Sequence, residues 1–469
     1  MQKSVLAEII LSLDKKEIRD LHKWLQSPAH NLRQDVIDLF DYLTKYQDNF
    51  EIAYEKERAW TAVFPDKPFD DAYMRQVMYF LLKSIEEYLV FADFTSDRVQ
   101  YQIALTRIYR KKKLDKAYKQ AYRLGSDSLE KQPLRNTYYY LNKFFLEHET
   151  YEYKLGVTQN APVNLQEVAD ALEQYFIMEK LMISNAMLAH HKVYQKANYD
   201  TGLLDEVIKY VGDRQLLDES AIASYYYAYL ASIYPAKTEY FDHFEKLIHG
   251  KSAESFTIPE TRNLYLTALN YCTAKVNQGA LEYCKMALKF YRTGVEKGFL
   301  LENNKITRYT FGNAVAFAIR IGEFEWSEQF IERFKHHLDD KERNSIVNFN
   351  LSRVYFEKGD YDKAQDMLTR FEYDDMLFNI IAKTILLKIY HEHEEYDAFE
   401  SLLESMRTYL QRKEALDPAR KQAYKNMISL MKKLLNVNIF SKTQREKFRE
   451  LVEKTNPLAE REWLLKQIE

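Results

Sequence analysis

Eight basic side chains lie close together in one short segment, and of all the residues these have the types and spacing best suited to binding chemistry. They are Arg107, Arg110, Lys111, Lys112, Lys113, Lys116, Lys119 and Arg123. Asp115 is the only acidic residue in segment 107–123, which therefore carries a net charge of +7. Ammonium and guanidinium groups bind carboxylates and phosphates. The sequence therefore makes these eight residues the candidate partner-binding site.

Three interpretations of this basic segment stay open. At helical spacing, Lys116, Lys119 and Arg123 fall on the side opposite the apolar residues Leu114, Ala117, Ala121 and Leu124, as on the solvent-facing side of an amphipathic helix. A plain solvated face usually mixes charges of both signs, so a face of one sign also favours an acidic protein or peptide partner. RNA or DNA is the third interpretation, although a net charge of −3 for the whole chain gives no general attraction to polyanions.

The histidines do not indicate a metal site. His391 and His393 are two residues apart, about 200° around a helix, so one helical turn cannot direct both at the same ion. We expect them on a solvated turn. His336 and Asp340 have the i,i+4 spacing that allows contact on a helix, and we expect them at a charged helix end.

Catalytic motifs are missing from the sequence as well. It contains no glycine-rich phosphate loop, no H-E-x-x-H and no paired C-x-x-C. We therefore predict no catalytic, cofactor-binding or metal-binding residue, no cofactor, and no enzymatic activity.

The elements that must position the basic segment are predicted to be helices. The chain has 469 residues but only 11 Gly and 9 Pro, far below average usage, so residues that break helices are scarce. Alternating β-branched runs that end in Asn-Gly or Asp-Gly turns do not occur. The predicted fold class is all-α, with helices joined by short turns.

A repeated pattern of apolar residues predicts helical hairpins. Around Gly359, apolar residues lie eight and four positions before and two, five and nine positions after, namely Leu351, Tyr355, Tyr361, Ala364 and Leu368. The same pattern recurs around Gly322, Glu394 and Lys112. Each unit is an apolar stripe, a turn and a second stripe. One hairpin cannot bury its own apolar face, so neighbouring hairpins must stack.

The segment Leu351–Ala364, with its run Gly359-Asp360-Tyr361-Asp362-x-Ala364, resembles the tetratricopeptide repeat family. The resemblance is clear over about 310–410 and looser over 96–300. It implies an α-solenoid of antiparallel helical hairpins. Members of the family are generally adaptors or scaffolds that bind proteins, and the resemblance implies the same role here.

The first 95 residues differ from the rest of the chain. Asp14 and Glu17 form a capping-box pattern that opens a helix, and residues 1–92 carry 12 Lys/Arg against 16 Asp/Glu, a net charge of −4. That charge argues against a DNA-binding head. We predict an N-terminal helical domain (1–95), a degenerate helical-repeat region (96–250), and tetratricopeptide-like repeats ending in a capping helix (251–469).

These features predict a non-enzymatic scaffold or adaptor that binds a partner peptide or helix in a solenoid groove. A nucleic-acid-associated regulator that uses segment 107–123 is the alternative function. Cys272 and Cys284 form no disulfide framework or metal pattern, Glu8 interrupts the N-terminal apolar run, and no apolar run is long enough to span a bilayer. We expect a cytoplasmic protein with no membrane partner. The sequence indicates no oligomeric state.

Overall fold

The computed structural model describes residues 1–157, 162–194, 196–250, 254–369, 376–412 and 417–469. Within these ranges the regular structure is helical and no β-strand forms; one isolated bridge joins Glu302 and Lys305. The predicted all-α class is confirmed. In the same ranges, no helix combines the length and apolarity needed to cross a bilayer.

The chain divides into two compact units, Met1–Lys180 and Leu181–Glu469. The predicted division into three domains stays a prediction, and residues 251–253 at its second boundary lie outside the described residues.

The N-terminal unit holds the first nine helices and the start of the tenth. Their bounds are α1 (Val5–Ser12), α2 (Lys15–Gln26), α3 (Gln34–Lys45), α4 (Phe50–Ala53), α5 (Lys56–Val63), α6 (Asp71–Ser96), α7 (Arg98–Lys111), α8 (Asp115–Glu130), α9 (Thr137–Val157) and α10 (Leu165–Val193).

The C-terminal unit holds the remaining helices. Their bounds are α11 (Leu204–Asp213), α12 (Ser220–Ile233), α13 (Thr238–His249), α14 (Ile258–Asn277), α15 (Tyr283–Glu296), α16 (Arg308–Arg320), α17 (Phe324–Phe334), α18 (Arg343–Glu357), α19 (Tyr361–Thr369), α20 (Met376–Glu392), α21 (Tyr396–Arg412), α22 (Pro418–Leu434), α23 (Lys442–Lys454) and α24 (Arg461–Lys466).

Helices α1–α6 form the helical head around a core of their own. The predicted capping box opens α2: the Asp14 carboxylate accepts from the Glu17 amide at 2.8 Å, and the Glu17 carboxylate accepts from the Asp14 amide at 2.8 Å. This fixes the start of α2, so that Leu21 and Leu25 face the core. The first half of α6 completes that core with Met74, Val77, Leu81 and Ile85.

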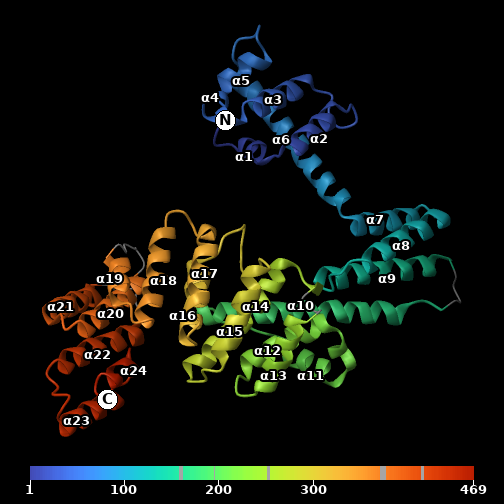
Figure 1. Cartoon of the computed structure of the whole chain (residues 1–469). Helices are drawn as coiled ribbons and strands as arrows, with labels where there is room; N and C mark the ends of the chain where they lie inside the picture. Colours follow the sequence, from blue (N-terminus) through green and yellow to red (C-terminus); the bar gives the residue numbers. More distant parts are fainter. Residues whose placement is uncertain (158–161, 195, 251–253, 370–375, 413–416) are drawn as a thin grey trace. The chain divides into compact units, whose positions relative to one another are not determined.

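Beyond the head, helices pack in sequential antiparallel pairs. In the N-terminal unit, α7, α8 and α9 contact one another (Figure 1). In the C-terminal unit each helix from α16 to α22 packs on the next, and α16 contacts α18 as α18 contacts α20. Contact with the next helix and the next but one is the pattern of stacked helical hairpins. The predicted arrangement, antiparallel helical hairpins preceded by a helical head, is confirmed.

Five of the hairpins share one turn geometry. Two residues after the first helix ends, the chain enters the left-handed region, with φ of 57° at Lys113, 96° at Gly279, 76° at Gly322, 80° at Gly359 and 58° at Glu394. Three of these residues are glycine, the residue that adopts such angles without steric cost. The turn predicted at Lys112 is therefore off by one residue, because the left-handed residue is Lys113.

The hydrogen bonds of these turns explain why they recur. In the Gly359 turn, the Asp360 amide donates to the Tyr355 carbonyl at 2.9 Å, and the Gly359 amide donates to the Phe356 carbonyl at 3.0 Å. This is the Schellman motif, which satisfies carbonyl groups that would otherwise lack partners at a helix end. It ends the first helix at a fixed residue and so sets where the second begins.

Replacing Gly359 with alanine tests this turn. A Cβ atom at φ 80° is strained, so we expect the Gly359→Ala variant to lose about 1 kcal/mol of unfolding free energy. Gly312→Ala is the matched control, because Gly312 lies inside α16 and an added Cβ would meet only Asn350 Oδ1 at 3.7 Å. We expect the control to keep or gain stability. Urea denaturation followed by circular dichroism measures both, and equal losses in the two variants would contradict the account.

A candidate basic interface on the α7–α8 hairpin

The candidate basic residues are distributed along one hairpin. Arg107, Arg110 and Lys111 lie in the last turns of α7, Lys112 and Lys113 lie in the turn, and Lys116, Lys119 and Arg123 lie on α8. Helix α8 buries Tyr118, Ala121, Gly125 and Leu129. Its three cations therefore fall on the exposed side, as the helical spacing predicts.

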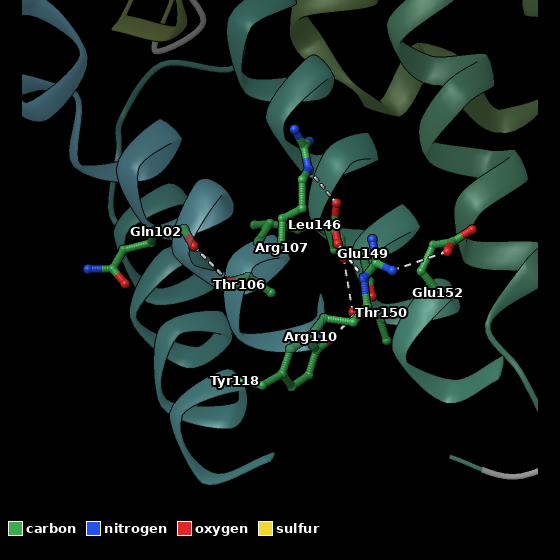
Figure 2. Close-up of polar contacts among 9 residues, drawn as sticks. All are labelled: Gln102, Thr106, Arg107, Arg110, Tyr118, Leu146, Glu149, Thr150 and Glu152. Atoms are coloured by element: carbon green, nitrogen blue, oxygen red, sulfur yellow. Dashed lines mark hydrogen bonds and ion pairs between the residues drawn. The ribbon is translucent and has the colours of Figure 1, made fainter. Parts of the chain in front are cut away.

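Two of the eight residues are held by a buried carboxylate. The Glu149 side chain, from α9, is only 5% exposed, and it accepts from Arg107 Nε at 2.9 Å and from Arg110 Nε at 2.8 Å. Arg110 Nη1 also donates to Glu152 at 3.3 Å. Figure 2 shows the Glu149 carboxylate lying between the two guanidinium groups. Arg110 is thus used mainly inside the protein, whereas Arg107 stays half exposed.

The electrostatics of Glu149 follow from this arrangement. Burial acts to raise the pKa of its carboxyl, but the hydrogen bonds and positive charges of Arg110 and Arg107 outweigh that effect, so the pKa lies below its usual value. A buried carboxylate with two cationic partners is charged at neutral pH. Glu149 therefore joins the end of α7 to α9 by charge as well as by packing.

Tyr118 contributes to the interior and is not available to a ligand. Its hydroxyl donates to the Glu149 backbone carbonyl at 3.3 Å, and its ring stacks on Tyr153 with centroids 3.8 Å apart. Burial raises the pKa of Tyr118 to about 12. The aromatic residues among the cations therefore do not all face solvent.

Six cations remain on the outside of the hairpin. Among the described residues, no hydrogen bond or ion pair joins any of their side-chain nitrogens to another residue, and all six side chains are exposed. They are Lys111, Lys112, Lys113, Lys116, Lys119 and Arg123. We call this set the basic surface.

Sequence reasoning missed Glu149 and Glu152. They lie 42 residues from their partners along the chain, as the pairs Arg107–Glu149 and Arg110–Glu152 show. A single acidic residue on a neighbouring helix gives no local signal. The apolar side predicted for α8 was also partly wrong: Leu114 is exposed, because it precedes the helix in a non-helical conformation.

Two further inward cations occupy matching repeat positions in the C-terminal unit. Arg353 and Lys388 each lie six residues before the left-handed residue of their hairpin. Arg353 Nη1 donates to the Gly312 carbonyl at 3.2 Å, and burial lowers the pKa of Arg353 to about 10. Lys388 pairs with Glu460, which ties the C-terminal segment to α20. A cation recurring in otherwise apolar helices was the signal that could have found them.

The histidine segments considered in the sequence analysis have structural roles. The His391 ring contacts the Phe399 and Trp463 rings, and burial lowers the pKa of His391. Asp340 pairs with Arg343, so the predicted contact between His336 and Asp340 is replaced by an ion pair. In the part of the chain that the structure describes, no three His, Cys, Asp or Glu residues are grouped to hold a metal ion.

The two cysteines are buried and unpaired. Burial raises the pKa of Cys272 to about 12, which keeps its thiol protonated and unreactive.

Comparisons with known proteins identify no family for the chain. No family model matches the chain, and no curated protein matches it. Among solved structures, the chain is similar to the crystal structure of the APC/C hetero-tetramer Cut9-Hcn1, with a TM-score of 0.29 and 13% identity, covering 96% of this chain and 86% of that chain. A likeness at that TM-score supports no inference, so the class of helical-repeat protein follows from the hairpins themselves.

Removing the charge of Glu149 tests its role. Glu149→Gln leaves two arginines beside a neutral amide, and we expect a loss of about 3 kcal/mol in unfolding free energy. This value is at the low end of the range for a broken buried ion pair, because both arginines reach water. Glu152→Gln is the matched control, since Glu152 is more exposed, and it should lose less than about 1 kcal/mol. Equal effects in the two variants would mean that Glu149 is not the anchor.

The lowered pKa of Glu149 also predicts how the stability of the wild type, compared with that of Glu149→Gln, depends on pH. Because the pKa of Glu149 is lower in the folded state, its charge stabilises the fold above the ordinary carboxyl value of 4.5, and this contribution disappears as the pH falls through the lowered pKa. The stability gap between the wild type and Glu149→Gln should stay constant from pH 7 to about 5 and narrow below that. Urea titrations across this range measure it, and a gap that widens on acidification would contradict the assignment.

Proposed function

We propose that this chain is a non-enzymatic scaffold or adaptor whose stacked hairpins bind a peptide or helix of a partner protein. The basic surface contacts acidic residues of that partner. The proposal includes no catalytic step, cofactor or metal, and places the protein in the cytoplasm.

The observation that carries the proposal is that the cations of the basic surface form no ion pair with the described residues. Six like charges lie on one hairpin with no ion pair to any residue that the structure describes, although the rest of the described chain is rich in ion pairs. Such charges repel one another over about 8 Å at physiological salt. An acidic partner removes that repulsion, and electrostatic complementarity of this kind speeds association and selects the partner.

The anchoring of the hairpin supports the same proposal. Arg107 and Arg110 fix the end of α7 through Glu149, and the Schellman turn at Lys113 fixes the start of α8. The six cations therefore project from a rigid frame. A preorganised surface loses less conformational entropy on binding than a flexible tail does.

Nucleic acid is the second candidate partner, because the same cations would bind phosphates. The net charge of −3 for the chain and of −4 for its first 92 residues makes a polyanion the weaker candidate. The salt dependence of binding distinguishes a nucleic acid from an acidic protein. A nucleic acid releases counter-ions on binding, so its affinity falls more steeply as the salt concentration rises.

Charge reversal tests the proposal directly. We expect the triple variant Lys112→Glu, Lys116→Glu and Lys119→Glu to bind a fluorescein-labelled, glutamate-rich helical peptide at least tenfold more weakly than the wild type does. Each lost charge contact of this kind contributes about 0.5–1 kcal/mol at an exposed site. Fluorescence anisotropy at 50 and 200 mM salt measures the affinity.

The control changes the same charge elsewhere in the same unit. Lys3, Lys15 and Lys67 are exposed, lie outside segment 107–123, and can be replaced together by glutamate. This control variant should bind the acidic peptide like the wild type. Equal weakening in both triple variants would show that the effect comes from net charge and not from the basic surface. Tighter, steeply salt-dependent binding of a single-stranded RNA of similar length would favour nucleic acid, the second candidate.

A further inference from the structure

The second half of α6 leaves large apolar side chains on the surface of the N-terminal unit. Val90 is 71% exposed, Phe91 51% and Phe94 41%. The structure describes α6 completely, and none of its residues after Ile85 is buried. The helix therefore leaves the head core after Tyr88 and Leu89, its last residues packed against that core, and presents beyond them an apolar face that no described segment covers.

This face borders a hollow with aromatic walls. The rings of Trp24 and His30 stack with centroids 3.5 Å apart, and the Trp24 and Phe91 centroids are 5.0 Å apart. Together with Val90 and Phe94 they line a hollow of about 600 Å³. We call these five residues the apolar patch. Exposed apolar patches rimmed by polar residues are typical of sites that bind other proteins.

The edge of the apolar patch is acidic. Among the described residues that line the hollow, Lys83 is the only lysine or arginine; its Nζ pairs with Glu86 at 2.6 Å and also lies near Glu87, so the two carboxylates leave one net negative charge there. Burial raises the pKa of Tyr88, and the carboxylates of Asp20, Glu17 and Asp14 raise it further. These three carboxylates are engaged at the start of α2, since Asp14 and Glu17 form its capping box and Asp20 pairs with Lys23 at 3.3 Å, so the charge open to an occupant at this edge is that of Glu87.

The acidic edge continues toward the end of α6. Asp93 is exposed between Phe91 and Phe94 and has no ion pair within the described ranges. Tyr101, from α7, extends the aromatic surface, since its ring centroid is 6.5 Å from that of Phe94. An occupant must therefore combine apolar anchors with positive charge.

We propose that the apolar patch binds an amphipathic helix of a partner protein, one that has apolar residues at i, i+3 or i+4 and i+7 and basic residues beside them. The apolar anchors would fill the hollow over Trp24 and Phe91, as in helix-in-groove recognition. The flanking cations would face Glu87 and Asp93. This site is separate from the basic surface and selects the opposite charge, so it extends the proposed function and does not rest on it.

Peptide binding to the whole 469-residue chain tests this inference. The probe is a fluorescein-labelled 18-residue helical peptide with leucines along one face and lysines elsewhere, and its partner peptide carries glutamates in place of the lysines. We expect the lysine peptide to bind at least tenfold more tightly than the glutamate peptide to a protein whose basic surface is partly neutralised by Lys112→Gln, Lys116→Gln and Lys119→Gln, which removes three positive charges without adding acidic groups. The double variant Val90→Ser and Phe94→Ser should weaken lysine-peptide binding at least tenfold.

Two further variants sharpen the test. Ile52→Ser, on α4, removes an apolar side chain of similar exposure (57%) that does not line the hollow, and binding should be unchanged. Glu87→Lys should weaken binding of the lysine peptide and strengthen binding of the glutamate peptide. Because Val90, Phe94 and Glu87 are exposed, these substitutions leave the core intact, and circular dichroism verifies the fold.

Several outcomes would overturn the inference. Equal binding of the lysine peptide to the wild type and to the Val90→Ser, Phe94→Ser variant would do so, as would no binding at all. Self-association in sedimentation that the double variant abolishes would assign the apolar patch to a second copy of the chain. Binding to vesicles of anionic lipid that the double variant abolishes would assign it to a membrane surface. Neutralisation of Lys112, Lys116 and Lys119 to glutamine should not weaken lysine-peptide binding, so failure of this site and of the proposed function remain distinguishable.

Discussion

The structure depends on one constraint: a two-helix hairpin cannot bury its own apolar face, so each hairpin must pack on the next. The contacts of α16 with α18 and of α18 with α20 carry this packing through the C-terminal unit. Recurring Schellman turns make the packing regular, because each ends one helix and starts the next at a fixed register. The head meets the constraint differently, by gathering α1–α6 around a core of its own.

Charge adds specificity to this apolar frame. Glu149 holds Arg107 and Arg110 between α7 and α9 (Figure 2), and the other six cations of the segment lie on the outside without an ion pair to any described residue. In the C-terminal unit, Lys388 and Glu460 play a comparable part by joining the last helices to α20. Buried ion pairs of this kind position elements more than they stabilise them. The N-terminal unit thus presents two surfaces of opposite character, one basic and one apolar with an acidic edge.

Much of the fold could be predicted because its signals are local. Scarce glycine and proline indicated helices, the capping box at Asp14 marked the start of α2, and the pattern around Gly359 located a hairpin turn. The Lys113 turn was placed one residue early because a lysine in the left-handed region leaves no mark of the kind that glycine leaves. Glu149 could not be found, because its role depends on which helix packs beside α7. The apolar patch was missed for the same reason. From the sequence alone, Val90, Phe91 and Phe94 look like core residues, because the sequence does not show where the head core ends.

The central claim is that the basic surface, held by a rigid hairpin, receives the partner. Hydrogen–deuterium exchange of the full chain with the glutamate-rich helical peptide, read by mass spectrometry, tests it most directly. The account predicts that protection on binding is confined to residues 111–123 and that the amides of α9 near Glu149 exchange equally slowly with and without the peptide. Protection elsewhere with none in 111–123, or loss of protection in α9 on binding, would contradict it.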